Sequence, residues 1–156
     1  MKRKLIRASI LLALTALFAW IAVPNILVAR NRSRQKRTMA DIRTIATAWE
    51  ARATDINSYT IGAVRGGPLP TAELVAALRP TYVREFPRAD GWDQEFQFLA
   101  GEYDEKGQAQ VYSIRSLGSD RRPDRDPNSF RGATTDFTDD VVYSNGSFLQ
   151  YPEGAG

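Results

Sequence analysis

The longest uncharged run of this chain lies near its N-terminus and limits what the chain can fold into. Residues 8–29 contain 22 consecutive residues without a charge, "ASILLALTALFAWIAV" followed by "PNILVA". A helix of this length crosses the hydrocarbon core of a bilayer, which is about 30 Å thick. Leu27-Val28-Ala29 fits the small-residue cleavage site of a secretory signal poorly. We therefore predict a retained transmembrane helix, in which Pro24 produces a kink rather than a break.

A second helical pattern follows this run. Apolar residues recur at three- and four-residue steps, which predicts one buried stripe on a helix. The members of this stripe are Met39, Ile42, Ile45, Ala46, Trp49, Ala53 and Ile56. Asn57-Ser58 and Gly62 end the pattern. If both patterns belong to one helix, about 54 residues extend roughly 80 Å, with the first half in lipid and the second half packed on a small domain.

Charge is distributed unevenly along the chain. Residues 1–37 carry nine basic and no acidic side chains, whereas the rest of the chain carries 12 basic and 18 acidic ones. Basic residues on both sides of an apolar run favour a membrane partner but leave its orientation open. The acidic remainder would repel a phosphate backbone, so we expect no nucleic-acid partner.

The composition also bounds the chemistry. The 156 residues suffice for one domain and include neither cysteine nor histidine. Disulfides, thiolate nucleophiles and the commonest general base are therefore excluded. We expect no enzymatic activity.

The segments after the long helix predict loops, one short helix and strands. Residues 60–70 read as a loop with Gly66-Gly67-Pro68 as breakers, and residues 71–80 as a short helix capped by Thr71 and closed by Pro80.

Three later segments have the alternation of strands. One places Phe96 and Phe98 on the same face. Residues 109–118 separate Tyr112 and Ile114 from the residues on the other face, which are Val111, Ser113 and Arg115. Residues 141–151 read as a hairpin about Asn145-Gly146. Three or four short strands after a long helix predict an α+β fold with a small antiparallel sheet.

The order of several segments resembles a known family. "AVPN" lies near the middle of the N-terminal helix and is followed, in order, by "RQKRTMADIRTIATAWEARATDINSYT", "LRPTYVREFPRADGWDQEFQF", "YSIRSLGSD" and "TDDVVYSNGSF". Together these segments cover nearly all of residues 20–151. In order and spacing they resemble the major pseudopilin of type II secretion, the general secretion pathway protein G family.

This resemblance implies a fold, a location and partners. The fold would be pilin-like, with a long N-terminal transmembrane and amphipathic helix packed on a small antiparallel sheet. Residues 1–7 would be a basic cytoplasmic start, and residues 8–29 would cross the bacterial inner membrane once. Residues 30–58 would continue the helix into the periplasm, where residues 59–156 would form a globular domain. Copies would assemble through the N-terminal helix into a short helical filament that pushes folded substrates outward. Other pseudopilins and inner-membrane components of the secretion apparatus would be further partners.

An acidic loop over residues 116–141 carries six aspartates with four arginines among them. Family members hold a calcium ion in the loop after "SLG", and calcium prefers carboxylate and carbonyl oxygens. Carried over to this chain, the resemblance implies a Ca²⁺ site formed by the Leu117 carbonyl, Asp120, Asp139 and Asp140.

The alternative for this loop is a solvated surface with ion pairs that contribute about 0–1 kcal/mol each. The pairs would join Asp120, Asp124 and Asp126 with Arg121, Arg122 and Arg125. We expect this alternative for Asp124 and Asp126. The resemblance assigns no role to Asp136.

The N-terminus departs from the family pattern. Alignment on Pro24 places Lys2 where the family has the glycine before the peptidase cut, and Arg7 where it has an acidic residue. A guanidinium there would repel the N-terminal amine of a neighbouring copy. Three explanations stay open: an anchored relative that is never processed, assembly through other contacts, or a start that differs from that of the natural chain.

Three functions follow from these patterns. We expect a calcium-stabilised structural subunit of a filament of the type II secretion kind. The alternative is an unprocessed, membrane-anchored periplasmic binding module that does not polymerise. A hydrolase that uses Asp139 and Asp140 has little support, because no base or substrate cleft accompanies these carboxylates.

Overall fold

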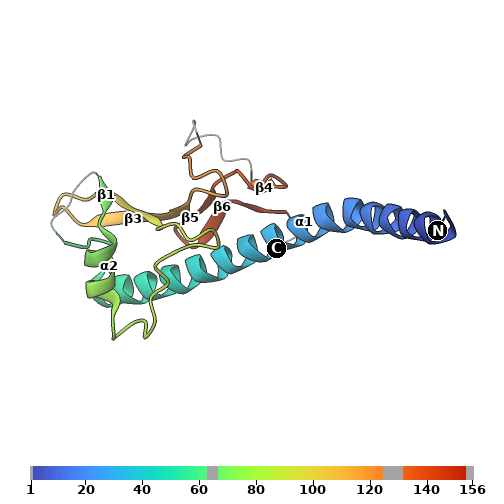
Figure 1. Ribbon diagram of the computed structural model, residues 1–156. Helices are drawn as coiled ribbons and strands as arrows, with labels where there is room; N and C mark the ends of the chain where they lie inside the picture. Colours follow the sequence, from blue (N-terminus) through green and yellow to red (C-terminus); the bar gives the residue numbers. More distant parts are fainter. Residues whose placement is uncertain (1, 63–66, 125–131, 154–156) are drawn as a thin grey trace. The chain divides into compact units, whose positions relative to one another are not determined.

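The structure is a computed structural model that describes residues 2–62, 67–124 and 132–153. These residues fall into two units, Met1–Ser33 (the N-terminal unit) and Arg34–Gly156 (the C-terminal unit). The elements, in chain order, are α1 (Lys2–Ile56), β1 (Pro68–Leu69), α2 (Thr71–Leu78), β2 (Gln97–Tyr103), β3 (Ala109–Ser116), β4 (Gly132–Thr134), β5 (Val141–Ser144) and β6 (Ser147–Pro152). The predicted α+β layout is confirmed (Figure 1).

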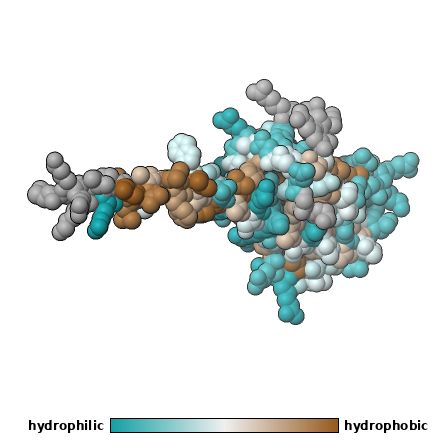
Figure 2. All heavy atoms as spheres, turned by 90° about the vertical axis from the view of Figure 1, so that its right-hand side faces the viewer, coloured by the Kyte–Doolittle hydropathy of each residue, from teal (hydrophilic) through white to brown (hydrophobic). Residues whose placement is uncertain are grey.

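α1 is one α-helix that continues through Pro24 and ends at Ile56, as the sequence predicted. In the N-terminal unit its large apolar side chains are exposed, for example Phe18 at 74% and Trp20 at 82%. Figure 2 shows the apolar surface along this part of the helix. Of the described helices, only α1 is long and apolar enough to cross a membrane.

In the C-terminal unit α1 contributes an apolar face to the core. The predicted stripe is buried at Met39, Ile42, Ile45, Ala46, Trp49 and Ala53. The Trp49 indole contacts Phe98 on β2 and Tyr112 on β3, with ring centroids 6.3 and 4.9 Å apart, and its N–H donates to the Tyr59 carbonyl. Ile56 was predicted in the stripe but is 44% exposed, because it is the last residue of the helix. The chain turns at Asn57, which has a positive φ of 53°.

The sheet has the strand order β1-β2-β3-β5-β6-β4. The predicted alternation on β3 is confirmed, since Tyr112 and Ile114 are buried against the core. The predicted hairpin is also confirmed. β5 and β6 pair antiparallel, and Asn145 and Gly146 between them both have positive φ, as a two-residue turn of this kind requires.

Three details of the fold differ from the sequence prediction. Residues 60–70 are not all loop, because β1 forms there and pairs with β2. The sheet is not wholly antiparallel, because β4 pairs parallel with β6. Thr71 is the first residue of α2 rather than its cap; Pro70 occupies the cap position, and no side chain caps this end.

A turn before β2 docks on α1 through polar groups that the sequence analysis did not single out. The Gly91 N–H donates to the Thr38 hydroxyl over 2.8 Å, and a Cβ at residue 91 would lie 2.4 Å from the Arg34 carbonyl oxygen. The buried Asp90 carboxylate accepts hydrogen bonds from the Trp92 N–H and from the Ser116 hydroxyl. Asp90 therefore links this turn to the end of β3, where the acidic loop begins.

Candidate metal centre

The two segments that carry the predicted calcium ligands lie side by side in the C-terminal unit. The Ser119 N–H donates to the Phe137 carbonyl over 2.8 Å. Gly118, which has a φ of 65°, lies close to the backbone of the second segment. A Cβ on it would be 2.6 Å from the Thr138 carbonyl oxygen. The Gln94 side chain donates to the Gly118 carbonyl over 2.9 Å and holds the segment from the other side. Hydrogen bonds and a close backbone approach therefore join the start and the end of the acidic loop.

Asp140 is the most buried of the predicted ligands, with no exposed surface. It directly precedes β5, and its carboxylate forms an ion pair with the guanidinium of Arg115 on β3. Arg115 pairs with Val142 in the ladder between β3 and β5, so Asp140 lies two residues away along the neighbouring strand. Burial raises the pKa of Asp140, while the hydrogen bond from the Asp124 N–H and the Arg115 guanidinium oppose this rise.

Asp124 and Asp140 are joined by two reciprocal hydrogen bonds. The Asp124 N–H donates to the Asp140 carboxylate over 3.0 Å, and the Asp140 N–H donates to the Asp124 carboxylate over 3.1 Å. The Gln150 side chain on β6 also donates to the Asp124 carboxylate, over 2.8 Å. We call these reciprocal hydrogen bonds the Asp124–Asp140 clasp. The sequence predicted a solvated ion pair for Asp124, but its carboxylate is half-buried and takes part in this clasp instead.

The other predicted ligands have separate partners. The Asp139 carboxylate accepts a hydrogen bond from the Thr134 hydroxyl on β4. Asp120 is exposed, and its carboxylate accepts a hydrogen bond from the Arg122 N–H over 3.0 Å. Leu117, whose carbonyl was predicted as a ligand, is partly buried directly before Gly118.

The two aspartates without an assigned role differ in what can be said of them. Asp136 is exposed and accepts hydrogen bonds from the N–H and the hydroxyl of Thr138. These bonds lower its pKa, because they stabilise the ionised carboxylate. Asp126, with its expected arginine partner Arg125, lies outside the described residues.

These residues, as they lie, do not fit a calcium centre. Calcium takes about six to eight oxygen ligands at roughly 2.3–2.6 Å. Within residues 2–62, 67–124 and 132–153, no three acidic side chains gather where they could hold a metal ion. One oxygen of Asp140 is buried without a hydrogen-bond partner, but the guanidinium on the same carboxylate already supplies a positive charge. The calcium site therefore stays a prediction from the resemblance, and we base no function on it.

The sequence analysis missed Arg115 as part of this site. One signal could have found it: Arg115 is the only charged residue in the segment "AQVYSIRS" that forms β3. A lone charge on a strand that enters the core requires an opposite charge nearby. The nearest candidates were the aspartates of the loop that follows.

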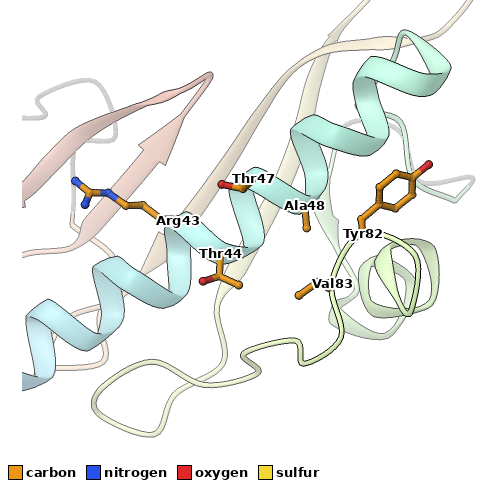
Figure 3. A pocket seen from close by; sticks show the side chains of 6 residues that line it. All are labelled: Arg43, Thr44, Thr47, Ala48, Tyr82 and Val83. Carbon is orange, nitrogen blue, oxygen red and sulfur yellow. The ribbon is translucent and has the colours of Figure 1, made fainter.

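A shallow groove lies beside α1 in the C-terminal unit (Figure 3). It is lined by Arg43, Thr44, Thr47, Ala48, Tyr82 and Val83. Two of its hydroxyl groups have partners: the Thr44 hydroxyl donates to the Ala40 carbonyl, and the Tyr82 hydroxyl donates to Asp55. None of the lining residues is acidic.

Asp139 and Asp140, the pair considered for hydrolysis, have different hydrogen-bond partners. Asp139 is bonded to Thr134, while Asp140 is bonded to Arg115 and Asp124. The Asp139 carboxylate thus contacts β4, whereas the Asp140 carboxylate contacts β3.

Comparison with known proteins finds no match for this sequence among protein-family models, curated proteins or solved structures.

Proposed function

We propose that this chain is a membrane-anchored structural subunit, similar to a pseudopilin of type II secretion, that associates with copies of itself through the N-terminal part of α1. The observation that carries the proposal is the character of α1. Its first part is apolar and exposed, while its later part contributes Trp49 and Ile45 to a buried core.

The exposed apolar residues of α1 support both anchoring and association. Side chains as large as Leu12, Phe18 and Trp20 are more than 70% exposed, far beyond the scattered apolar residues of a protein surface. A lipid bilayer covers such a surface, and packing against other helices can cover part of it. We propose the bacterial inner membrane as this bilayer, with the C-terminal unit in the periplasm.

The layout of the C-terminal unit supports the pilin-like part of the proposal. A long helix comes first, its apolar face is buried against an antiparallel ladder, and a tight hairpin of β5 and β6 follows later in the chain. This order is what the resemblance implies for the segments from "RQKRT" to "TDDVVYSNGSF".

We also propose that the chain is not an enzyme. It has no histidine or cysteine. The described carboxylates of the acidic loop accept hydrogen bonds within the loop and the sheet, which suits a structural role.

The test uses the absence of cysteine in the chain, which allows cysteines to be introduced at will. In a helical filament the contacts are head-to-tail, so one residue meets a different residue of the next copy. Pairs of cysteines placed between Leu11 and Val23, at offsets of one to three helical turns, are cross-linked in native membranes. We expect at least one pair to give a ladder beyond the dimer, and the corresponding single cysteines to give no ladder. Glu105→Cys, on an exposed turn, is the control and should stay monomeric.

Two results would count against the proposal. If no pair gives more than a dimer, the second candidate, an anchored binding module that does not polymerise, replaces the filament subunit. Lys2 and Arg7 favour this candidate, because Lys2 departs from the residue expected for processing and Arg7 from the residue expected for assembly. If the mature protein is found in the soluble fraction without residues 8–29, as mass spectrometry of its N-terminus would show, the anchor itself is excluded.

A further inference from the structure

The base of the acidic loop contains a carboxylate that cannot exist uncompensated. Asp140 has no exposed surface, and an ionised carboxylate removed from water is strongly unfavourable unless it is paired and hydrogen-bonded. In the site implied by the resemblance, a divalent cation would compensate this charge.

In the structure a side chain of the protein compensates it. The Arg115 guanidinium contacts the Asp140 carboxylate through Nε and a terminal nitrogen. The terminal nitrogen also donates to the Asp124 carbonyl over 3.4 Å. The Arg115 side chain is only 16% exposed, so it contacts Asp124 and Asp140 from inside the unit.

We infer that Arg115 is the internal counter-ion of the acidic loop and closes it around a guanidinium, so that closure requires no divalent cation. The reciprocal hydrogen bonds then fix Asp124 and Asp140 to each other, and Gln150 ties Asp124 to β6. This inference concerns the C-terminal unit alone and does not depend on the proposed function.

In this position the Arg115 guanidinium would repel a metal ion bound to Asp140. A calcium ion bound to Asp140 would lie beside a guanidinium of the same sign of charge, at a carboxylate that has no exposed surface. Calcium could bind there only if Arg115 moved away and gave up its contacts with Asp140 and Asp124. Arg115 therefore excludes calcium from this end of the loop.

The first experiment measures the melting temperature of the full chain in detergent micelles by near-ultraviolet circular dichroism. We expect the melting temperature with calcium chloride and with excess EGTA to agree within about 1 °C, because a ligand that does not bind cannot shift the equilibrium. A clear fall of the melting temperature in EGTA would overturn the inference.

The second experiment is a double-mutant cycle in EGTA with Arg115→Gln and Asp140→Asn. Each single variant leaves one buried charge unpaired and should lower the melting temperature by about 5–10 °C. The double variant removes both charges, so its loss should be clearly smaller than the sum of the single losses. If a single variant fails to fold while the double variant folds, the pairing is supported in the same way.

Arg122→Gln is the matched control, because Arg122 is an exposed arginine of the same loop. It should melt like the parent protein. Additive losses in the cycle, or an equal loss in the Arg122 variant, would overturn the assignment of Arg115 as the counter-ion.

Discussion

Asp124 and Asp140 fix each other in place, since the backbone N–H of each donates to the carboxylate of the other, over 3.0 and 3.1 Å. Both residues thus use their main chain and their side chain in one contact. The contact joins the residue that precedes the central part of the acidic loop to the residue that precedes β5. The described part of the loop is therefore closed at its base.

The Asp124–Asp140 clasp predicts that Asp124→Ala lowers the stability of the protein. This variant leaves the Asp140 N–H and the Gln150 amide without their acceptor, so we expect the free energy of unfolding to fall by about 1–3 kcal/mol. Urea titration monitored by tryptophan fluorescence measures it. Asp120→Ala is the control, and its effect should be below about 0.5 kcal/mol because Asp120 is exposed. Equal effects of the two variants would show that the clasp does not stabilise the loop.

The core contact of α1 predicts a larger effect for Trp49→Ala. The indole is fully buried between β2 and β3 and donates a hydrogen bond to Tyr59. Truncation should cost about 3–5 kcal/mol of unfolding free energy. Thr47→Ala, at an exposed position of the same helix, should cost less than about 0.5 kcal/mol. Chemical denaturation of both variants compares them, and a Trp49 effect as small as that of Thr47 would contradict the packing.

Gly118 predicts a steric effect of a single methyl group. An added Cβ would lie 2.6 Å from the Thr138 carbonyl oxygen, and the φ of 65° disfavours any side chain. We expect Gly118→Ala to lower the unfolding free energy by about 1–3 kcal/mol. Gly101→Ala is the matched control, since nothing lies within 4 Å of its added Cβ. Thermal unfolding measures the stability of both variants. An equal loss in the two would refute the close approach of the two segments.

Asp136 predicts that the stability of the fold depends on pH. Its pKa is lowered because the N–H and the hydroxyl of Thr138 stabilise the ionised form. The unfolded chain therefore binds a proton more readily than the folded one, so this contribution to stability is present above about pH 4 and is lost as the pH falls further. Carboxyl NMR titration should place the Asp136 pKa below that of a free aspartate. In Thr138→Val, which removes the hydroxyl, the pKa should move back up; an unchanged value would disprove this cause.

The apolar part of α1 predicts the effect of a buried charge in lipid. Leu17→Arg places a cation near the middle of residues 8–29, which costs about 2.5–3.5 kcal/mol of insertion free energy. We expect a smaller fraction of this variant to resist extraction from membranes at alkaline pH. Thr15→Ala is the control and should be retained as well as the parent protein. Equal retention of the two variants would show that this segment does not cross the bilayer.

Much of the fold could be predicted from local patterns. The stripe from Met39 to Ala53 follows the helical period, and Asn145-Gly146 supplies the positive φ that the hairpin turn requires. The short strands could not be found in this way. β1 has two residues and β4 has three, and each exists only because a longer strand from another part of the chain pairs with it.

The candidate site was predicted less well, for a related reason. The family resemblance implied that Leu117 and Asp120 lie near Asp139 and Asp140, and the structure brings these two segments together. Which side chain faces Asp140 depends instead on the register between β3 and β5, which pairs Arg115 with Val142. Register is a tertiary property that the residues of one strand do not reveal.

The lengths of β1 and β4 have a consequence for how copies of the chain could join. These two strands form the outer margins of the sheet, and within the described residues β1 offers two residues and β4 three for pairing with a strand of another molecule. Short margins of this kind discourage growth by strand addition and protect against amyloid-like aggregation.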